Sequence, residues 1–283
     1  MMKTSYLYDS GGKRQYPEDE MIFCPDEHGG IFGVLDGVSF YAPDDGPRLF
    51  DGLTQGQLAV RIVKRTFFYC RQTDPVGETL ILANKGLGLI GKSNGLKLEE
   101  PELLPGADFA IAQIMGKTIL LVWGGDCGAV WLNKDGSYDG TINRAYSHEL
   151  WVEETFAKIK AKHNGNLNLA WEEWLPLRRE HVRKHQNKPG GWSTLNGRPE
   201  FANSWAKTNL SVNNLRIMIL FTDGFVSFKD TENPEKLSEK LIGIYKGRGL
   251  SAILKSTRQA QTEHLPRSHE AICPEATAIA IEF

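Results

Sequence analysis

The sequence is poor in cysteine, lacks any long apolar run and carries almost no excess of charge of either sign. Its four cysteines are scattered without a CxxC pair, which argues against a structural zinc site and favours reduced thiols. No apolar run approaches the roughly 18 residues of a membrane span, and the first residues lack the apolar stretch of a signal peptide. The 33 basic and 35 acidic residues are mixed along the chain, which argues against a nucleic-acid or anionic-membrane partner. We therefore expect a cytoplasmic protein.

What the sequence does contain is a series of short apolar segments typical of strands, interleaved with helical stretches. The apolar pattern predicts strands at 21–25, 31–37, 109–114, 118–125, 128–136, 216–224 and 276–283. Helical periodicity covers 53–70, 79–90 and most of 146–188 and 234–270. The three strands between residues 109 and 136 are predicted to form an antiparallel meander. Without regular βαβ alternation, this order predicts an α+β fold of packed antiparallel sheets, with residues 1–283 in one domain.

One glycine-rich segment matches a nucleotide-binding pattern. Residues 86–93, GLGLIGKS, satisfy the P-loop pattern GxxxxGK[ST]. A P-loop cradles phosphates only where a strand precedes it and the Lys-Ser pair opens a long helix. Asn94 and Gly95 form a turn signal instead, followed by a stretch rich in Glu and Pro. A P-loop nucleotide-binding protein is therefore the weaker alternative, against a helix end whose glycines allow close packing.

Acidic residues stand where apolar strands end. Asp36 ends IFGVLD, Asp126 follows TILLVWGG, Asp223 ends IMILFTD, and Glu18-Asp19 leads into MIF. Like charges gathered at one sheet edge repel each other unless a cation compensates them. Hard oxygen ligands without histidine suit Mg²⁺ or Mn²⁺. The sequence therefore predicts a metal centre.

The order of these motifs resembles the metal-dependent (PPM-type, type 2C) serine/threonine protein phosphatase family, in a divergent prokaryotic form. Six segments, each short by itself, occur in the family's order from about residue 14 to the C-terminus. They are RQYPED (14–19), VLDGVS (34–39), GADFAIAQI (106–114), VWGGDCGAVWL (122–132), ILFTDGF (219–225) and EATAIAI (275–281). The resemblance implies a four-layer α-β-β-α sandwich with a two-metal centre at one end of the paired sheets.

The resemblance also implies the metal ligands and the reaction. Asp36 would bridge two Mn²⁺ or Mg²⁺ ions, and Glu18 and the Gly37 carbonyl would complete one site. Asp223 would hold the other ion, Asp19 would act through a water, and Asp126 would hold a third ion with Asp223.

In the reaction that the family implies, Arg14 would clamp the phosphate, and a metal-bridging water would attack phosphorus. The implied activity is a phosphoprotein phosphatase that hydrolyses phosphoserine and phosphothreonine in a protein substrate.

Two departures from the family pattern concern the metal site. Pro274 stands where the family's last metal aspartate is expected, and proline has no side-chain ligand. Glu275, one position later, and Asp108, which replaces the family's usual Thr, are the candidate substitutes. If neither reaches the metal, the alternative is a pseudophosphatase that binds a phosphoprotein without turnover.

A helical and irregular insertion is expected at about 146–214, in the position of the family's flap beside the active site. Within it, Gly190, Gly191 and Trp192 are the candidate flap residues near the substrate. The tryptophans of this region are expected mostly to pack the insertion.

Overall fold

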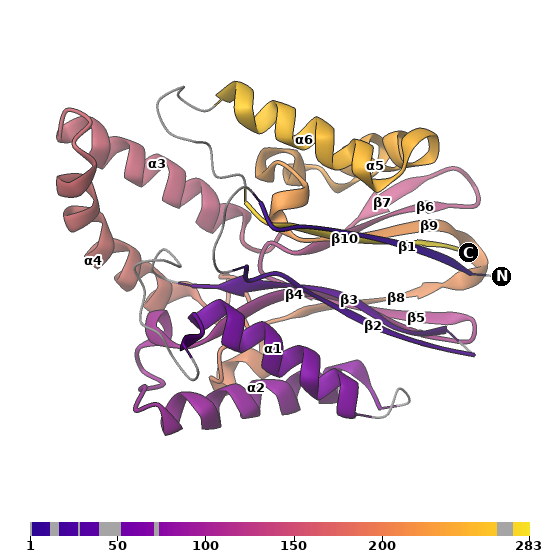
Figure 1. The fold of residues 1–283 in the computed structure, drawn as a ribbon, viewed down its shortest axis with the longest axis horizontal. Helices are drawn as coiled ribbons and strands as arrows, with labels where there is room; N and C mark the ends of the chain where they lie inside the picture. Colours follow the sequence, from indigo (N-terminus) through magenta and orange to yellow (C-terminus); the bar gives the residue numbers. More distant parts are fainter. Residues whose placement is uncertain (1, 12–16, 28, 40–51, 71–73, 265–273) are drawn as a thin grey trace.

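The chain forms two five-stranded sheets packed face to face and covered by helices on both outer sides (Figure 1). The computed structural model describes residues 2–11, 17–27, 29–39, 52–70, 74–264 and 274–283. The strands are β1 (Lys3–Asp9), β2 (Glu20–Asp26), β3 (Gly29–Val38), β4 (Gly106–Met115), β5 (Thr118–Gly124), β6 (Gly128–Asn133), β7 (Tyr138–Gly140), β8 (Ala206–Ser211), β9 (Leu215–Phe221) and β10 (Ala276–Glu282). The α-helices are α1 (Gln55–Tyr69), α2 (Val76–Ser93), α3 (Tyr146–Lys162), α4 (Leu167–His185), α5 (Pro234–Arg248) and α6 (Leu250–His264).

The strand order is β1-β10-β9-β6-β7 in one sheet and β2-β3-β4-β5-β8 in the other, and the neighbouring strands are antiparallel. Helices α1 and α2 cover the second sheet, whereas α5 and α6 cover the first (Figure 1). The predicted α-β-β-α sandwich is therefore confirmed.

Alternate side chains of β4 point to opposite faces of the sheet, so this strand contributes to two hydrophobic cores. Phe109 and Ile111 pack against α1 and α2, while Ala110 and Ala112 face the opposite sheet. Because both faces of the strand are buried, its sequence is a nearly continuous apolar run.

The predicted meander of residues 109–136 is wrong at its last strand. β4 and β5 do pair, but β6 pairs with β7 and β9 in the other sheet. The chain therefore crosses between the sheets at Gly125, Asp126 and Cys127. The apolar pattern alone does not distinguish this crossing from a hairpin, because β6 is buried in either arrangement. The crossing carries an acidic residue from the end of β5 to the junction of the two sheets.

Helices α3 and α4 project from one end of the sandwich (Figure 1). They pack on each other through Trp151, Phe156, Ile159 and Trp174. The rings of Trp151 and Phe156 both contact the ring of Trp174, which agrees with the expectation that the tryptophans pack the insertion. The insertion predicted at about 146–214 as helical and irregular also contains β8, an edge strand that pairs with β5.

The P-loop alternative is excluded by the course of α2. Residues 86–93 lie inside this helix and end it, so the Lys-Ser pair does not open a helix. The glycines allow close packing instead, because a Cβ added at Gly88 would lie 2.7 Å from the carbonyl oxygen of Gly197. Among the described residues, no helix has both the length and the apolar character needed to span a bilayer.

Candidate metal centre

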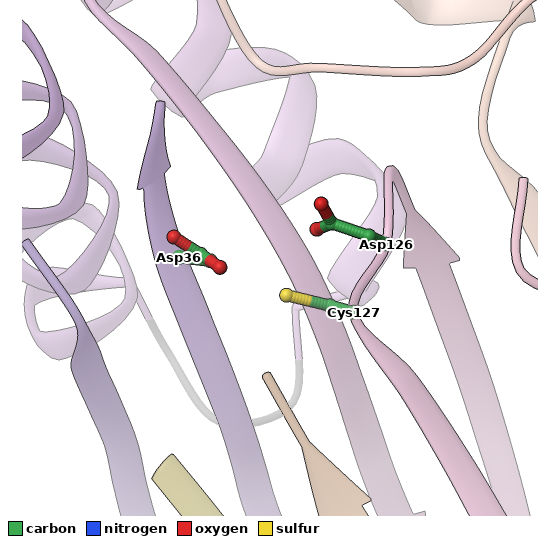
Figure 2. Close-up of side chains that lie close together, drawn as sticks. All are labelled: Asp36, Asp126 and Cys127. Carbon is green, nitrogen blue, oxygen red and sulfur yellow. The ribbon is translucent and has the colours of Figure 1, made fainter. Parts of the chain in front are cut away.

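Three side chains, one from β3 and two from the connection between β5 and β6, converge where the chain crosses from one sheet to the other. Asp36 lies near the end of β3, and Asp126 and Cys127 follow β5. One potential ligand atom from each lies within 4.8 Å of the other two. Figure 2 shows the two carboxylates and the thiol pointing toward one another. The structure thus brings together two of the predicted metal ligands.

Asp108 joins this group through the register of β3 and β4. Asp36 and Asp108 are directly opposite each other, so their side chains emerge on the same face of the sheet. Asp108 is only 4% exposed, and its carboxylate occupies the space where a side chain of residue 125 would begin. Gly125 also has φ +70°, so a glycine is required at this turn for two independent reasons.

Asp19 is held by two hydroxyl groups and Glu275 holds the backbone next to it. The hydroxyls of Thr222 and Thr277 donate to Asp19 Oδ2 at 2.8 and 2.7 Å. Glu275 Oε2 accepts the backbone N–H groups of Glu18 and Asp19, both at 2.7 Å. Glu275, 3% exposed, therefore positions the segment that carries two predicted ligands, a role that the sequence did not suggest.

Glu18, just before β2, places its side chain against the N-terminus of α1. Its Oε1 accepts a hydrogen bond from Ser39 Oγ at 2.5 Å and another from Thr54 Oγ1, the residue that caps the helix. Gly37 donates its N–H to the Glu18 carbonyl at 3.1 Å, and a Cβ at Gly37 would lie 2.7 Å from that same oxygen. The glycine of the Asp-Gly motif is therefore required for close packing against Glu18.

The carboxyl groups share one electrostatic environment. Burial raises the pKa of Asp36 well above its usual value, and the charges of Asp223 and Asp19 raise it further. Burial likewise raises the pKa of Asp126, with the neighbouring charge of Asp108 next in effect. Burial raises the pKa of Asp19 to about 8 and that of Asp108 to about 7. Without a cation, the cluster therefore favours protonated carboxyl groups.

Two buried carboxylate oxygens are evidence for a cation site among these carboxyl groups. Oδ1 of Asp108 and Oδ1 of Asp126 are buried, and neither has a hydrogen-bond partner among the described residues. A buried carboxylate oxygen without a donor is costly unless a cation compensates it. The donor set is rich in carboxylates and holds no histidine, which suits Mg²⁺ or Mn²⁺.

One acidic residue near the cluster was missed by the sequence. Burial raises the pKa of Glu149, in the first turn of α3, to about 7, and the charge of Asp223 adds to this effect. Asn143 Nδ2 donates to Glu149 Oε2 at 2.9 Å and orients the carboxylate. No motif in the sequence marks this glutamate, because it belongs to the helical insertion and reaches the site only through the packing of α3.

The predicted flap residues occupy different environments. Trp192 is 5% exposed and stacks on His148 with ring centroids 3.9 Å apart. It lines a cavity of about 50 Å³ with Val38, two residues after Asp36. Gly190 has φ +76° with open space around it, whereas a side chain at Gly191 would meet the carbonyl of residue 185. Arg14, the predicted phosphate clamp, lies outside the described residues.

Comparison with solved structures finds similar folds at low sequence identity. PppA, a regulatory component of T6SS in Pseudomonas aeruginosa, has a TM-score of 0.60 and 14% identity, with 99% of this chain and 97% of that one covered. The serine/threonine phosphatase Stp1 from Staphylococcus aureus has a TM-score of 0.60 and 14% identity over 100% of this chain and 95% of that one. The catalytic domain of the serine/threonine phosphatase PstP, in complex with 2 manganese ions, has a TM-score of 0.53 and 12% identity over 99% and 97%.

No protein-family model matches the sequence, and no curated protein matches it. At these identities the similarity establishes the fold, and the chain has the fold of PPM-type serine/threonine phosphatases.

Proposed function

We propose that this protein is a metal-dependent phosphatase that hydrolyses phosphoserine and phosphothreonine in a protein substrate. The observation that carries the proposal is the meeting of carboxylates from separate strands at one end of the sandwich, with buried oxygens that lack donors among the described residues. The solved structures of similar fold include serine/threonine phosphatases, one of them bound to manganese. The proposal includes that the protein is bacterial and acts in the cytoplasm.

In the proposed centre, carboxylates and one backbone carbonyl would hold two Mn²⁺ or Mg²⁺ ions. The proposed ligands are Glu18, Asp19, Asp36, Gly37 and Asp223, with Asp126 for a third ion. Bound divalent cations would supply Lewis acidity toward the phosphoryl oxygens and lower the pKa of a bound water.

The chain's own contribution is to hold these ligands in place before the substrate arrives. Thr222 and Thr277 fix the orientation of Asp19 through two hydroxyl donors. Glu275 fixes the backbone of the Glu18-Asp19 pair from the far end of the sequence. Pro274 is itself anchored, because Arg258 Nη2 donates to its carbonyl oxygen at 2.5 Å.

Asp108 is the proposed substitute for the aspartate that is replaced by Pro274. It is buried, lies opposite Asp36 in the β3–β4 register, and has an oxygen without a donor among the described residues. Glu275 is less suited to this role, because its Oε2 already accepts two backbone N–H groups. This assignment favours an enzyme with an altered ligand set.

The second candidate is a pseudophosphatase that binds a phosphoprotein without turnover. Two observations favour it. Proline at position 274 offers no side-chain ligand, and Glu275 Oε2 already accepts hydrogen bonds from the backbone N–H groups of Glu18 and Asp19. If Asp108 does not bind metal, one ion of the pair would be weakly held.

The two candidates are separated by measuring hydrolysis of p-nitrophenyl phosphate and of a phosphothreonine peptide with EDTA, Mg²⁺ or Mn²⁺. Asp36→Asn tests the centre, and Asp139→Asn, at an exposed position in β7, is the matched control. Mn²⁺-dependent turnover that is lost only in Asp36→Asn supports the phosphatase. Binding of Mn²⁺ and phosphopeptide without turnover supports the pseudophosphatase. Failure of the folded wild-type protein to bind Mn²⁺ would refute both.

A further inference from the structure

Cys127 is the one member of the converging group that is not a carboxylate, so a metal site built from oxygen ligands alone does not account for it. Its side chain is fully buried, and the thiol forms no disulfide. A buried cysteine commonly packs as a small apolar residue, and Cys127 does contact the core between the sheets. Its sulfur, however, also lies within 4.8 Å of a carboxylate oxygen of Asp36 and of Asp126 (Figure 2).

The crossing turn is what points two consecutive side chains at the same place. In an extended strand, neighbouring side chains alternate between faces, so Asp126 and Cys127 would diverge. Here Gly125, with φ +70°, turns the chain between β5 and β6. Figure 2 shows the Cys127 sulfur directed toward Asp36, with the Asp126 carboxylate beside it.

A second observation independently indicates a cation at this position. Asp108 is 4% exposed, stands opposite Asp36 in the sheet, and contacts the backbone of the turn at Gly125. Its Oδ1 has no hydrogen-bond partner in the described part of the chain. The thiol therefore faces a group of carboxylates in which one oxygen still lacks a compensating charge.

We propose that Asp36, Asp126 and Cys127 form a mixed oxygen–sulfur site that binds a thiophilic divalent cation such as Zn²⁺ or Co²⁺. The inference rests on the proposed metal centre and adds a ligand of a different chemical class. Carboxylates alone favour Mg²⁺ and Mn²⁺, whereas a thiolate shifts the preference toward zinc-like ions. The thiol releases its proton to solvent as the metal–sulfur bond forms, so no oxidant or reductant is needed.

The geometry requires only a small closure. With metal–oxygen and metal–sulfur bonds of about 2.0–2.3 Å, tetrahedral ligand atoms stand roughly 3.5 Å apart. Ligand atoms that now lie within 4.8 Å of one another must approach by about 1 Å, which side-chain rotation supplies. Zn²⁺ bound in this way would compete with Mn²⁺ for Asp36, so the site would make the protein's activity sensitive to zinc.

The test is Co²⁺ binding followed by absorption spectroscopy, because a thiolate ligand produces a sulfur-to-cobalt charge-transfer band that carboxylates do not. The wild-type protein is compared with Cys127→Ser, which replaces sulfur by oxygen at nearly constant volume. The matched control is Cys24→Ser/Cys70→Ser/Cys273→Ser, which leaves Cys127 as the single thiol of the chain. Isothermal titrations with Zn²⁺, Mn²⁺ and Mg²⁺ complete the comparison.

We expect the charge-transfer band in the wild-type protein and in the triple variant, and its loss in Cys127→Ser. The Zn²⁺ dissociation constant should rise at least about tenfold in Cys127→Ser, the scale seen even for outer-shell partners. The Mg²⁺ constant should change by less than about threefold, since Mg²⁺ gains little from sulfur.

Two outcomes would overturn the inference, and they are distinguishable. If Co²⁺ and Mn²⁺ bind but no sulfur band appears, Cys127 is a core residue only and the proposed phosphatase centre stands. If the folded wild-type protein binds none of these ions, both the mixed site and the proposed metal-dependent function fail.

Discussion

Asp108→Asn offers the sharpest test of the electrostatic argument, because its stabilising effect should shrink when metal binds and should vary with pH. Burial raises the pKa of Asp108 from 3.8 to about 7. The folded, metal-free protein therefore retains a proton that the unfolded chain releases above about pH 4. As a result, the metal-free wild-type protein loses stability as the pH rises from about 4 to about 7. Asparagine cannot ionise, so the variant escapes this loss.

The magnitude follows from the pKa values. A difference of one pKa unit corresponds to about 1.4 kcal/mol, so a shift of about three units amounts to about 4 kcal/mol. In EDTA near pH 8, Asp108→Asn should therefore be up to about 4 kcal/mol more stable than the wild-type protein, or roughly 10 °C higher in Tm. Near pH 4 the difference should fall below about 1 kcal/mol. Saturating Mn²⁺ should stabilise the wild-type protein by about 3 kcal/mol at a hundredfold excess over Kd, and the variant by less.

The assay is urea and thermal unfolding at both pH values, with EDTA or Mn²⁺, and Asp139→Asn serves as the exposed control. A variant that is less stable than the wild-type protein in EDTA near pH 8 would refute the assignment of a buried, repelled carboxylate to Asp108. An equal Mn²⁺-induced shift in both proteins would remove Asp108 from the ligand set and strengthen the pseudophosphatase alternative.

The remaining predictions concern the groups that hold the site together. Glu275→Ala leaves two buried backbone N–H groups without their acceptor, so urea unfolding should show that the free energy of unfolding falls by about 2–5 kcal/mol. Glu275→Gln should lower it by less. A fall below about 0.5 kcal/mol for Glu275→Ala would contradict this role. Gly125→Ala should lower the free energy of unfolding by at least about 2 kcal/mol and weaken Mn²⁺ binding. Gly136, with φ +93°, has open space around it, so Gly136→Ala should lower the free energy of unfolding by about 1 kcal/mol and leave Mn²⁺ binding unchanged. Trp192→Ala should expose the α3–α4 insertion to limited proteolysis; an unchanged digestion pattern would show that the stack on this tryptophan does not hold the insertion.

Most strands and helices were predictable from local pattern, because each must bury one face and the pattern records which residues do so. The strands predicted at 21–25 and 31–37 lie within β2 and β3, which pair, and the helix predicted at 79–90 lies within α2. β8 was missed, because its sequence AKTNLS is polar and the strand is stabilised by backbone pairing at the edge of the sheet.

The sequence by itself indicated which carboxylates belong to the candidate site, since Asp36, Asp126 and Asp223 each follow an apolar strand. It could not show how they meet, because that depends on the change of sheet between β5 and β6. That change of sheet also places Cys127 among the carboxylates, and the packing of α3 adds Glu149. Local sequence thus determined the strands and their terminal charges. Only the tertiary structure decided which charges share a low-dielectric space, because electrostatic coupling depends on distance and burial across elements far apart in the chain.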